Sequence, residues 1–466
     1  MKYKITCIVF IFIFILTSGF GCKIVDKETQ QAMTPVELKY WRVFEGSDAF
    51  DEIIAAYQQL HPFVTIDYRL LRYEEYESEL IDAMAEDRGP DMFSIHSTWV
   101  NKYKNKIKPV PPSITMAYPV VKGTLKKEII PELRTTRSVN LTQLKDQFID
   151  TVFDDVVFDD ENEVTGEIEK RIYGLPLAID TLVLFYNRDL FNNSSIAKPP
   201  MYWNREFQQT VKRLTKLDVR GKIIQSGISL GGSRNIERST DILALLMMQN
   251  GAVMSEGSSI LFNKIPAIYA GQDYNPGLEA LRFYSDFANS SKEVYSWNAE
   301  LGNSLEMFIS GNLAMMLGYS YQIPAIKASA PKLNFGISPV PQIESSQRAL
   351  NYANYWVETV SRKSAYSDEA WDFLQFATRA ENVKSFLVKT KKPSALREIA
   401  TAQIEDEDIG IFASQALTAK SWYRGKDFLA TEEILYDMID TAATGNVENM
   451  QAVISTAAQR VQQTVY

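Results

Sequence analysis

Residues Glu37 to His96 decide the fold of this chain, and they read ELKYWRVFEGSDAFDEIIAAYQQLHPFVTIDYRLLRYEEYESELIDAMAEDRGPDMFSIH. Short apolar runs alternate there with segments whose apolar residues recur at helical spacing. We predict strands at 38–44, 64–70 and 91–96, and helices that begin near Asp48 and at Tyr73. Alternation of this kind is typical of a parallel sheet covered by helices.

The first of these helices shows the pattern most clearly. Phe50, Ile53, Ile54 and Tyr57 fall at positions i, i+3, i+4 and i+7, so they share one face. Pro62 ends the helix, because proline lacks the backbone N–H that a further turn needs. We therefore expect this face to pack against the sheet.

Two loops of this region are candidate parts of a binding site. In open sheets of this class, ligands bind beyond the carboxyl ends of the strands. The loop after the first strand contains Phe44 and Glu45, and the loop after the third strand contains Ser97, Thr98 and Trp99. We expect these five residues to face a ligand, with a place in the core as the alternative for Trp99.

The amino-terminal segment, MKYKITCIVFIFIFILTSGFGC, predicts export. Its apolar run of roughly a dozen residues is short for a membrane span and typical of a signal peptide. We expect residues 1–21 to be that signal, Cys22 to become a lipidated first residue, and 22–36 to form a polar tether. Gly21 fits such a site. Gly19 stands where a branched apolar residue is usual, so ordinary cleavage and an uncleaved anchor stay open.

Charge and cysteine content narrow the classes of function. The formal net charge of −9 becomes −11 if Lys2 and Lys4 leave with the signal, and so acidic a chain argues against a nucleic-acid partner. The second cysteine, Cys7, would leave with the signal, so the mature chain could not form a disulfide. Without residues 1–21, about 445 of the 466 residues remain, which allows two to three domains.

Enzymatic activity is the weaker hypothesis. Residues 227–231, GISLG, match the G-x-S-x-G motif of hydrolases, but that fold places its histidine after the serine, and His61 and His96 both precede Ser229. The two distant histidines and one mature cysteine do not make a metal cluster. We expect no catalytic residue, metal or cofactor, although a glycosidase pair of carboxylates stays open.

A segment in the middle of the chain carries a family resemblance. Residues 172–191, IYGLPLAIDTLVLFYNRDLF, contain a predicted strand at 177–186 and a turn at 187–189. They resemble the extracellular solute-binding proteins of ABC transporters, family 1, in which Tyr-Gly-x-Pro leads into Tyr-Asn-x-Asp-Leu. Further similar segments follow in the family's order at 307–326, 334–343, 354–378 and 421–425.

The resemblance implies an α/β, two-lobed periplasmic-binding-protein-like fold of type II, with discontinuous lobes joined by crossover strands. Lobe one would comprise 37–179 and 353–405, and lobe two 180–352 and 406–466. The family captures a solute between its lobes by hinge closure and delivers it to the permease subunits of an ABC transporter.

The resemblance also implies site residues on the crossovers. Asp180 falls on the first crossover, where it would hydrogen-bond a solute hydroxyl or, alternatively, make a structural hydrogen bond. Trp356 falls on the second crossover, where it would form the floor of the cleft or pack in the core.

Further matches lie on the two lobes. Trp99, Tyr319 and Trp422 match stacking positions, and Tyr321 would share one face of an extended strand with Tyr319. Arg234 and Asn235, in the loop 231–235, are candidate polar contacts, with a solvated loop as the alternative.

We therefore expect an extracellular, membrane-anchored, monomeric protein that binds a small solute, with a sugar or oligosaccharide favoured by the aromatic matches. A carbohydrate-binding adhesin or sensor that does not serve transport is the alternative function.

Overall fold

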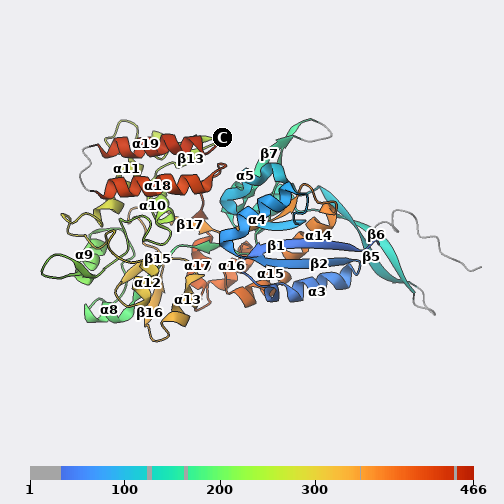
Figure 1. Cartoon of the computed structure of the whole chain (residues 1–466), viewed down its shortest axis with the longest axis horizontal. Coiled ribbons are helices and arrows are strands. Elements are labelled where there is room, and N and C mark those ends of the chain that lie inside the picture. The colour runs from blue at the N-terminus through green and yellow to red at the C-terminus, as the bar shows by residue number, and fades with distance from the viewer. Residues whose placement is uncertain (1–32, 123–127, 162–165, 347, 445–448) are drawn as a thin grey trace, which may run out of the picture.

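The computed structural model describes residues 33–122, 128–161, 166–346, 348–444 and 449–466, which form two lobes joined by crossing strands (Figure 1). The predicted signal peptide, Cys22 and most of the tether lie outside these residues. Strand β1 begins at Val36, so the folded body starts at the last residue of the predicted tether. None of the described helices is long and apolar enough to cross a membrane.

Lobe one is built on a five-stranded sheet in the order β2-β1-β3-β18-β4. The strands are Val64–Leu71 (β2), Val36–Val43 (β1), Met92–His96 (β3), Trp356–Ser361 (β18) and Ile107–Lys108 (β4). Strand β1 pairs parallel with β2 and β3, as the alternation predicted. Strand β18, from a distant part of the chain, runs antiparallel between β3 and β4.

Helices surround this sheet (Figure 1). They are Asp51–Leu60 (α3), Tyr73–Ala85 (α4), Val100–Tyr103 (α5), Leu141–Gln147 (α6), Asp150–Val156 (α7), Ser367–Ala377 (α14), Ala380–Thr390 (α15) and Arg397–Gln403 (α16). Two hairpins project from the lobe: Ser113–Lys122 (β5) with Glu128–Arg137 (β6), and Val157–Glu161 (β7) with Ile168–Ile172 (β8). Of the four residues predicted to share one face, Phe50, Ile53 and Tyr57 are buried and Ile54 is partly buried against the core; Phe50 is the residue just before α3.

Lobe two contains a three-stranded antiparallel sheet of Met315–Gly318 (β15), Val183–Asn187 (β10) and Phe335–Ser338 (β16). Its helices are Arg188–Asn193 (α8), Arg205–Leu214 (α9), Ser239–Gln249 (α10), Pro276–Asp286 (α11), Ser304–Ile309 (α12), Gln322–Ser329 (α13), Phe428–Ala443 (α18) and Met450–Gln463 (α19). Two short hairpins are Lys216–Leu217 (β11) with Ile223–Gln225 (β12), and Ser255–Glu256 (β13) with Ser259–Ile260 (β14).

A small sheet lies where the chain crosses between the lobes. Its strands are Ala419–Lys420 (β19), Asn351–Asn354 (β17) and Asp180–Thr181 (β9), and helix Gly410–Ala416 (α17) packs on it. Strand β9 leads into β10 of lobe two, and β17 leads back into β18 of lobe one. The two crossovers pair with each other antiparallel, Asn354 opposite Asp180.

Two local predictions need correction. The strand expected over 177–186 is divided into β9 and β10, and the turn expected at 187–189 is the start of α8. Asn187 caps this helix, because its side-chain oxygen accepts from the backbone N–H groups of Asp189 and Leu190 at 3.0 and 3.1 Å. The extended strand expected to carry Tyr319 and Tyr321 ends at Gly318.

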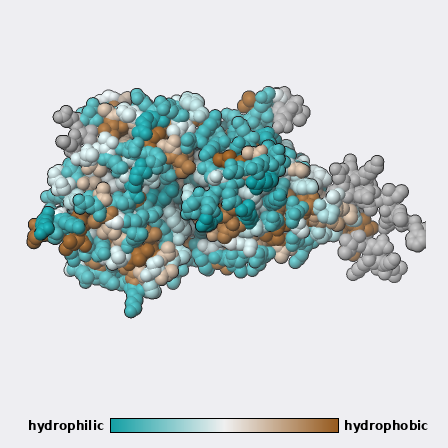
Figure 2. Space-filling view, in the orientation of Figure 1, coloured by the Kyte–Doolittle hydropathy of each residue, from teal (hydrophilic) through white to brown (hydrophobic). Residues whose placement is uncertain are grey.

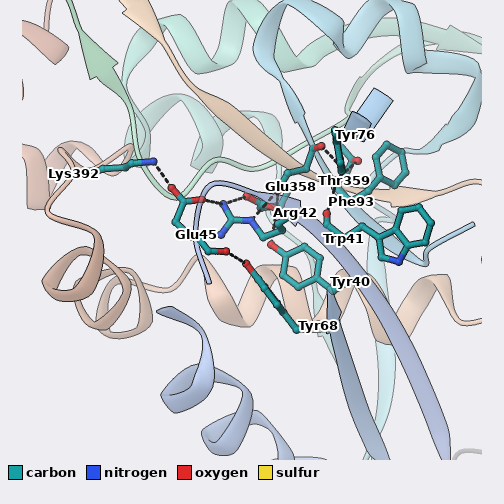
Figure 3. A network of polar contacts seen from close by, with 11 residues as sticks. Tyr40, Trp41, Arg42, Glu45, Tyr68, Tyr76, Phe93, Glu358, Thr359 and Lys392 are labelled. Carbon is teal, nitrogen blue, oxygen red and sulfur yellow. Dashed lines mark hydrogen bonds and ion pairs between the residues drawn. The ribbon is translucent and has the colours of Figure 1, made fainter. Parts of the chain in front are cut away.

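A buried ionic network holds the three central strands of lobe one together (Figure 3). Arg42, at the end of β1, lies 3.0 Å from a carboxylate oxygen of Glu358 on β18, and its Nε donates to the Ser94 hydroxyl on β3 at 2.9 Å. The hydroxyl of Tyr40 donates to Glu358 at 2.5 Å. Arg42 and Glu358 are almost fully buried, so each charge depends on the other for compensation.

The network also reaches the loop after β1. Glu45 lies 3.4 Å from Arg42 and forms a second ion pair with Lys392, and Tyr68 donates to the Glu45 carbonyl at 2.7 Å. Burial alone would raise the pKa of Glu45, but the charges of Arg42 and Lys392 outweigh burial and hold that pKa below its usual value. Glu45 is therefore ionised and fixed in place at neutral pH.

Removing one charge of the central pair should destabilise lobe one strongly. We expect Glu358→Gln to lower the free energy of unfolding by about 3–5 kcal/mol, because the buried charge of Arg42 would lose its nearer partner and keep only the longer contact with Glu45. Urea denaturation measures this. The control is Glu79→Gln, which removes an exposed ion pair with Arg69 and should cost no more than about 1 kcal/mol. Equal losses in the two variants would contradict the central role of the network.

Candidate functional site

The loop after β1 presents an exposed aromatic ring in a strained backbone conformation. Phe44 has a φ of 72°, in the left-handed region that bulky residues rarely adopt, and 59% of its surface is exposed. The strain costs about 1–2 kcal/mol. It persists because Val43 is held in β1 on one side and Glu45 is held by its ion pairs on the other. Strain of this kind is concentrated at functional sites.

Phe44 belongs to an aromatic platform that also includes Tyr73 and Trp356. The rings of Phe44 and Tyr73 stack with centroids 5.6 Å apart and planes at 25°, and Phe44 meets Trp356 edge-on at 5.5 Å. Tyr73 is 45% exposed and Trp356 is partly exposed. The ring of Trp99 contacts the ring of Trp356 edge-on, with centroids 5.6 Å apart, and Trp99 is itself buried. The platform therefore offers apolar ring faces at the carboxyl-terminal edge of the lobe-one sheet.

His96, at the end of β3, adjoins this platform. Its Nδ1 lies 2.7 Å from the Thr98 hydroxyl, and its Nε2 lies 3.0 Å from the side-chain oxygen of Asn354. Burial lowers the pKa of His96 to about 4, and the positive charge of Arg238 acts in the same direction. The ring is therefore neutral at physiological pH and stacks on Phe428 of α18 at 6.0 Å.

The facing wall in lobe two is organised by Asp241, which is buried in the first turn of α10. Asp241 accepts from Arg238 Nε at 2.8 Å and from the Tyr319 hydroxyl at 2.7 Å. Tyr319 is buried, and its ring stacks on Tyr321 at 5.8 Å with an interplanar angle of 18°. Tyr321 is 49% exposed. The buried Asp241 carboxylate therefore fixes Tyr319, and Tyr319 in turn stacks on the accessible ring of Tyr321.

Arg238 is the second strained residue of the site. Its φ is 58°, and it lies at the start of α10 with Asp241 at 2.8 Å and Glu432 at 3.7 Å. Burial raises the pKa of Tyr73 in lobe one, and the charge of Arg238 in lobe two opposes that shift. The stacking of His96 on Phe428 and this electrostatic influence place Arg238 near the platform where the two lobes meet.

Several residues predicted for the site are occupied by contacts within the chain. Asp180 accepts from the Thr181 and Ser320 N–H groups, both at 2.9 Å, and from the Ser320 hydroxyl at 2.7 Å. These are structural hydrogen bonds across the crossover, the alternative given above. Burial raises the pKa of Asp180 despite these bonds. Trp422 is buried against Phe262.

Arg234 and Asn235, the predicted polar contacts in the loop 231–235, also form hydrogen bonds within the chain. Arg234 makes two hydrogen bonds to Glu433 on α18, at 3.0 and 2.6 Å, on an exposed surface. The Asn235 amide donates to the carbonyls of Asn298 and Leu301. Ser97 and Thr98 are buried in a short 3₁₀ helix that directly follows His96 in the chain.

The sequence reasoning missed Tyr73, His96, Arg238 and Phe428. Tyr73 follows the carboxyl end of β2, so the rule applied to the first and third strands would also have found it. His96 is the last residue of β3 and was assigned to the strand. Arg238 and Phe428 carry no local signal, because only the packing of α10 and α18 brings them to the interlobe face.

Two α/β lobes joined by two paired crossovers form the fold of two-lobed solute-binding proteins. The sequence profile described as "Bacterial extracellular solute-binding protein" matches residues 44–384, and the chain belongs to that family. It is a family of binding proteins.

The solved structures agree on the fold. The chain is similar to a cyclo/maltodextrin-binding protein complexed with maltotetraose, with a TM-score of 0.68 and 16% identity over 92% of this chain and 97% of that one. It is also similar to the sugar-binding protein MalE of Xanthomonas citri, with a TM-score of 0.67, 16% identity and the same coverage. At this identity the likeness concerns the fold alone.

Among characterised relatives, the chain is 19% identical over 388 residues to the galactooligosaccharide-binding protein of Bacillus subtilis, covering 82% of this chain and 77% of the relative. It is 23% identical over 247 residues to the maltodextrin-binding protein MdxE of the same organism, covering 51% and 53%.

The strain at Phe44 can be tested by two substitutions at this position. We expect Phe44→Gly to be more stable than Phe44→Ala by about 1 kcal/mol, because glycine adopts positive φ without a steric cost and both variants lack the ring. Urea denaturation measures the difference. At Tyr321, where φ is −63°, we expect the opposite order: Tyr321→Ala should be more stable than Tyr321→Gly. The same order at both positions would argue against strain at Phe44.

The neutral state of His96 is directly measurable, because the chain contains only two histidines. We expect NMR titration to give a pKa of about 4 for the signal that disappears in His96→Gln. Between pH 6.5 and 4 the unfolded chain would take up a proton at His96 that the folded chain does not. This histidine's contribution to stability is thus complete above pH 6.5 and declines as the pH falls towards 4. A pKa near 6.5 would show that the ring is accessible to water.

Proposed function

We propose that this chain captures a neutral sugar or oligosaccharide between its lobes. The observation that carries the proposal is the platform of Phe44, Tyr73 and Trp356, in which Phe44 and Tyr73 are 59% and 45% exposed, together with the exposed ring of Tyr321 in lobe two. Binding sites for sugars need flat apolar surfaces for the C–H faces of the ring and a few fixed polar groups for the hydroxyls. The platform provides the flat apolar surface. The wall formed by Arg238, Asp241 and Glu432 provides the fixed polar groups.

The charges of the site favour a ligand without net charge. Arg238 is already compensated by Asp241 and Glu432, so an anionic solute would find no free cation in this wall. A hydroxyl group, in contrast, can bind between a guanidinium and a carboxylate, since it donates and accepts at once. The names of the relatives, which bind galactooligosaccharides and maltodextrins, support the same class.

The remaining parts of the mechanism belong to the same proposal. Lobe one comprises 37–179 and 353–405, and lobe two 180–352 and 406–466, so β9 and β17 form the hinge. Closure is a population shift driven by contacts that the solute makes with both walls at once. The closed form delivers its solute to an ABC permease, and a lipidated Cys22 holds the protein at the outer face of the membrane.

A thermal-shift screen against sugars, polyols and peptides should identify the solute, because a ligand that binds only the folded state raises the melting temperature. For a sugar that does so, we expect Phe44→Ala and Trp356→Ala each to weaken binding at least about fivefold in calorimetry, since each removes a stacking face. Trp99→Ala should weaken binding indirectly by loosening Trp356.

The matched control is Tyr366→Ala, which removes a ring of 39% exposure next to α14, far from the platform. This variant should bind as the unmodified chain does. Unchanged affinity in both Phe44→Ala and Trp356→Ala would overturn the stacking proposal, and a shift only with peptides would overturn the ligand class.

A further inference from the structure

The turn between β11 and β12 exposes aliphatic side chains to an unusual degree. Val219 is fully exposed, and Leu217 and Ile224 beside it are 47% and 56% exposed. Apolar residues gather at the outer end of lobe two, near α9 (Figure 2). Single exposed aliphatic residues are ordinary on protein surfaces, but three on one short hairpin indicate an interaction site.

The hairpin is a rigid projection and not a loose loop. The Asp218 carboxylate accepts from the backbone N–H groups of Arg220 and Lys222 at 2.8 and 2.9 Å. The Asp218 N–H donates to the Lys222 carbonyl at 2.8 Å, and Gly221 has the positive φ of 80° that closes the turn. Val219 is therefore held at the tip of a turn in which the N–H groups of Asp218, Arg220, Gly221 and Lys222 are hydrogen-bonded.

The charges on the hairpin are opposite in sign to those of the whole chain. Lys216, Arg220 and Lys222 are exposed, and none of them forms an ion pair with another of the described residues. The single carboxylate, Asp218, is directed onto its own turn. The hairpin thus carries a net positive charge on a protein whose formal net charge is −9.

We propose that this hairpin, residues 216–225, is a contact site for an anionic lipid surface. Aliphatic side chains flanked by lysine and arginine are the combination that binds the interface of anionic bilayers, where the apolar groups enter and the cations meet the headgroups. The convex tip argues for a deformable surface, since a protein partner would need a matching pocket for Val219. This site lies at the opposite end of the molecule from Val36 (Figure 1), so its use would lay the long axis along the membrane.

The test uses residues 22–466 with Cys22→Ser, which retains every described residue and lacks the lipid. We expect this protein to sediment with vesicles of phosphatidylglycerol and phosphatidylcholine, less so at high salt, and not with phosphatidylcholine alone. Val219→Asp, and separately Lys216→Glu with Lys222→Glu, should each reduce binding at least about tenfold, since each lysine near the surface contributes roughly fivefold.

Two control variants match these changes elsewhere. Ile268→Asp alters an aliphatic residue that is 74% exposed outside the hairpin, and Lys332→Glu with Lys384→Glu makes the same charge change at exposed sites. Both should bind as the parent does. Unaltered melting temperatures would confirm that the hairpin variants are folded. The proposal is overturned if the parent does not bind, if it binds both kinds of vesicle equally, or if hairpin and control variants lose binding alike.

Discussion

The buried pair of Arg42 and Glu358 imposes the chain connectivity of the whole molecule. Arg42 lies in the first strand of lobe one, at a depth where a guanidinium needs a carboxylate. The carboxylate comes from β18, which the chain reaches only after it has built most of lobe two. Lobe one is thus completed by a returning segment, and the chain must cross between the lobes at β9 and again at β17. The two crossing strands pair with each other and form part of the small sheet between the lobes.

The two walls of the interlobe space follow one design. In lobe one, Arg42 and Lys392 fix Glu45, and the neighbouring residue Phe44 is forced into positive φ with its ring exposed. In lobe two, a buried Asp241 fixes Arg238, which also has positive φ, and holds the tyrosine on which Tyr321 stacks. In lobe one the strained residue adjoins a largely buried ion pair, and in lobe two it belongs to one, so in each lobe the ion pair fixes the position of the strained residue.

Local patterns predicted the elements better than they predicted the site. The spacing of Phe50, Ile53 and Tyr57 requires only neighbours within one helix, and the structure confirms it. The role of Asp180 depends on Ser320, 140 residues away, whose N–H and hydroxyl satisfy the carboxylate. Likewise, the position of Arg238 depends on the packing of α10 and α18. A single sequence reports which residues are chemically capable of binding, whereas tertiary partners decide which remain available.

Contacts between the lobes differ in kind on the two sides of the hinge. Near the crossovers, Asp155 of α7 lies 2.9 Å from Arg424 of lobe two, which also donates to the Asp154 carbonyl. Asp155 is fully buried, so separating it from Arg424 would leave an uncompensated charge. Across the site, in contrast, the direct contact is the stacking of neutral His96 on Phe428, which is worth about 0.5–1.5 kcal/mol beyond its buried area. If the lobes move as proposed above, the ionic contact is the more costly of the two to separate, because it would leave a buried charge without compensation.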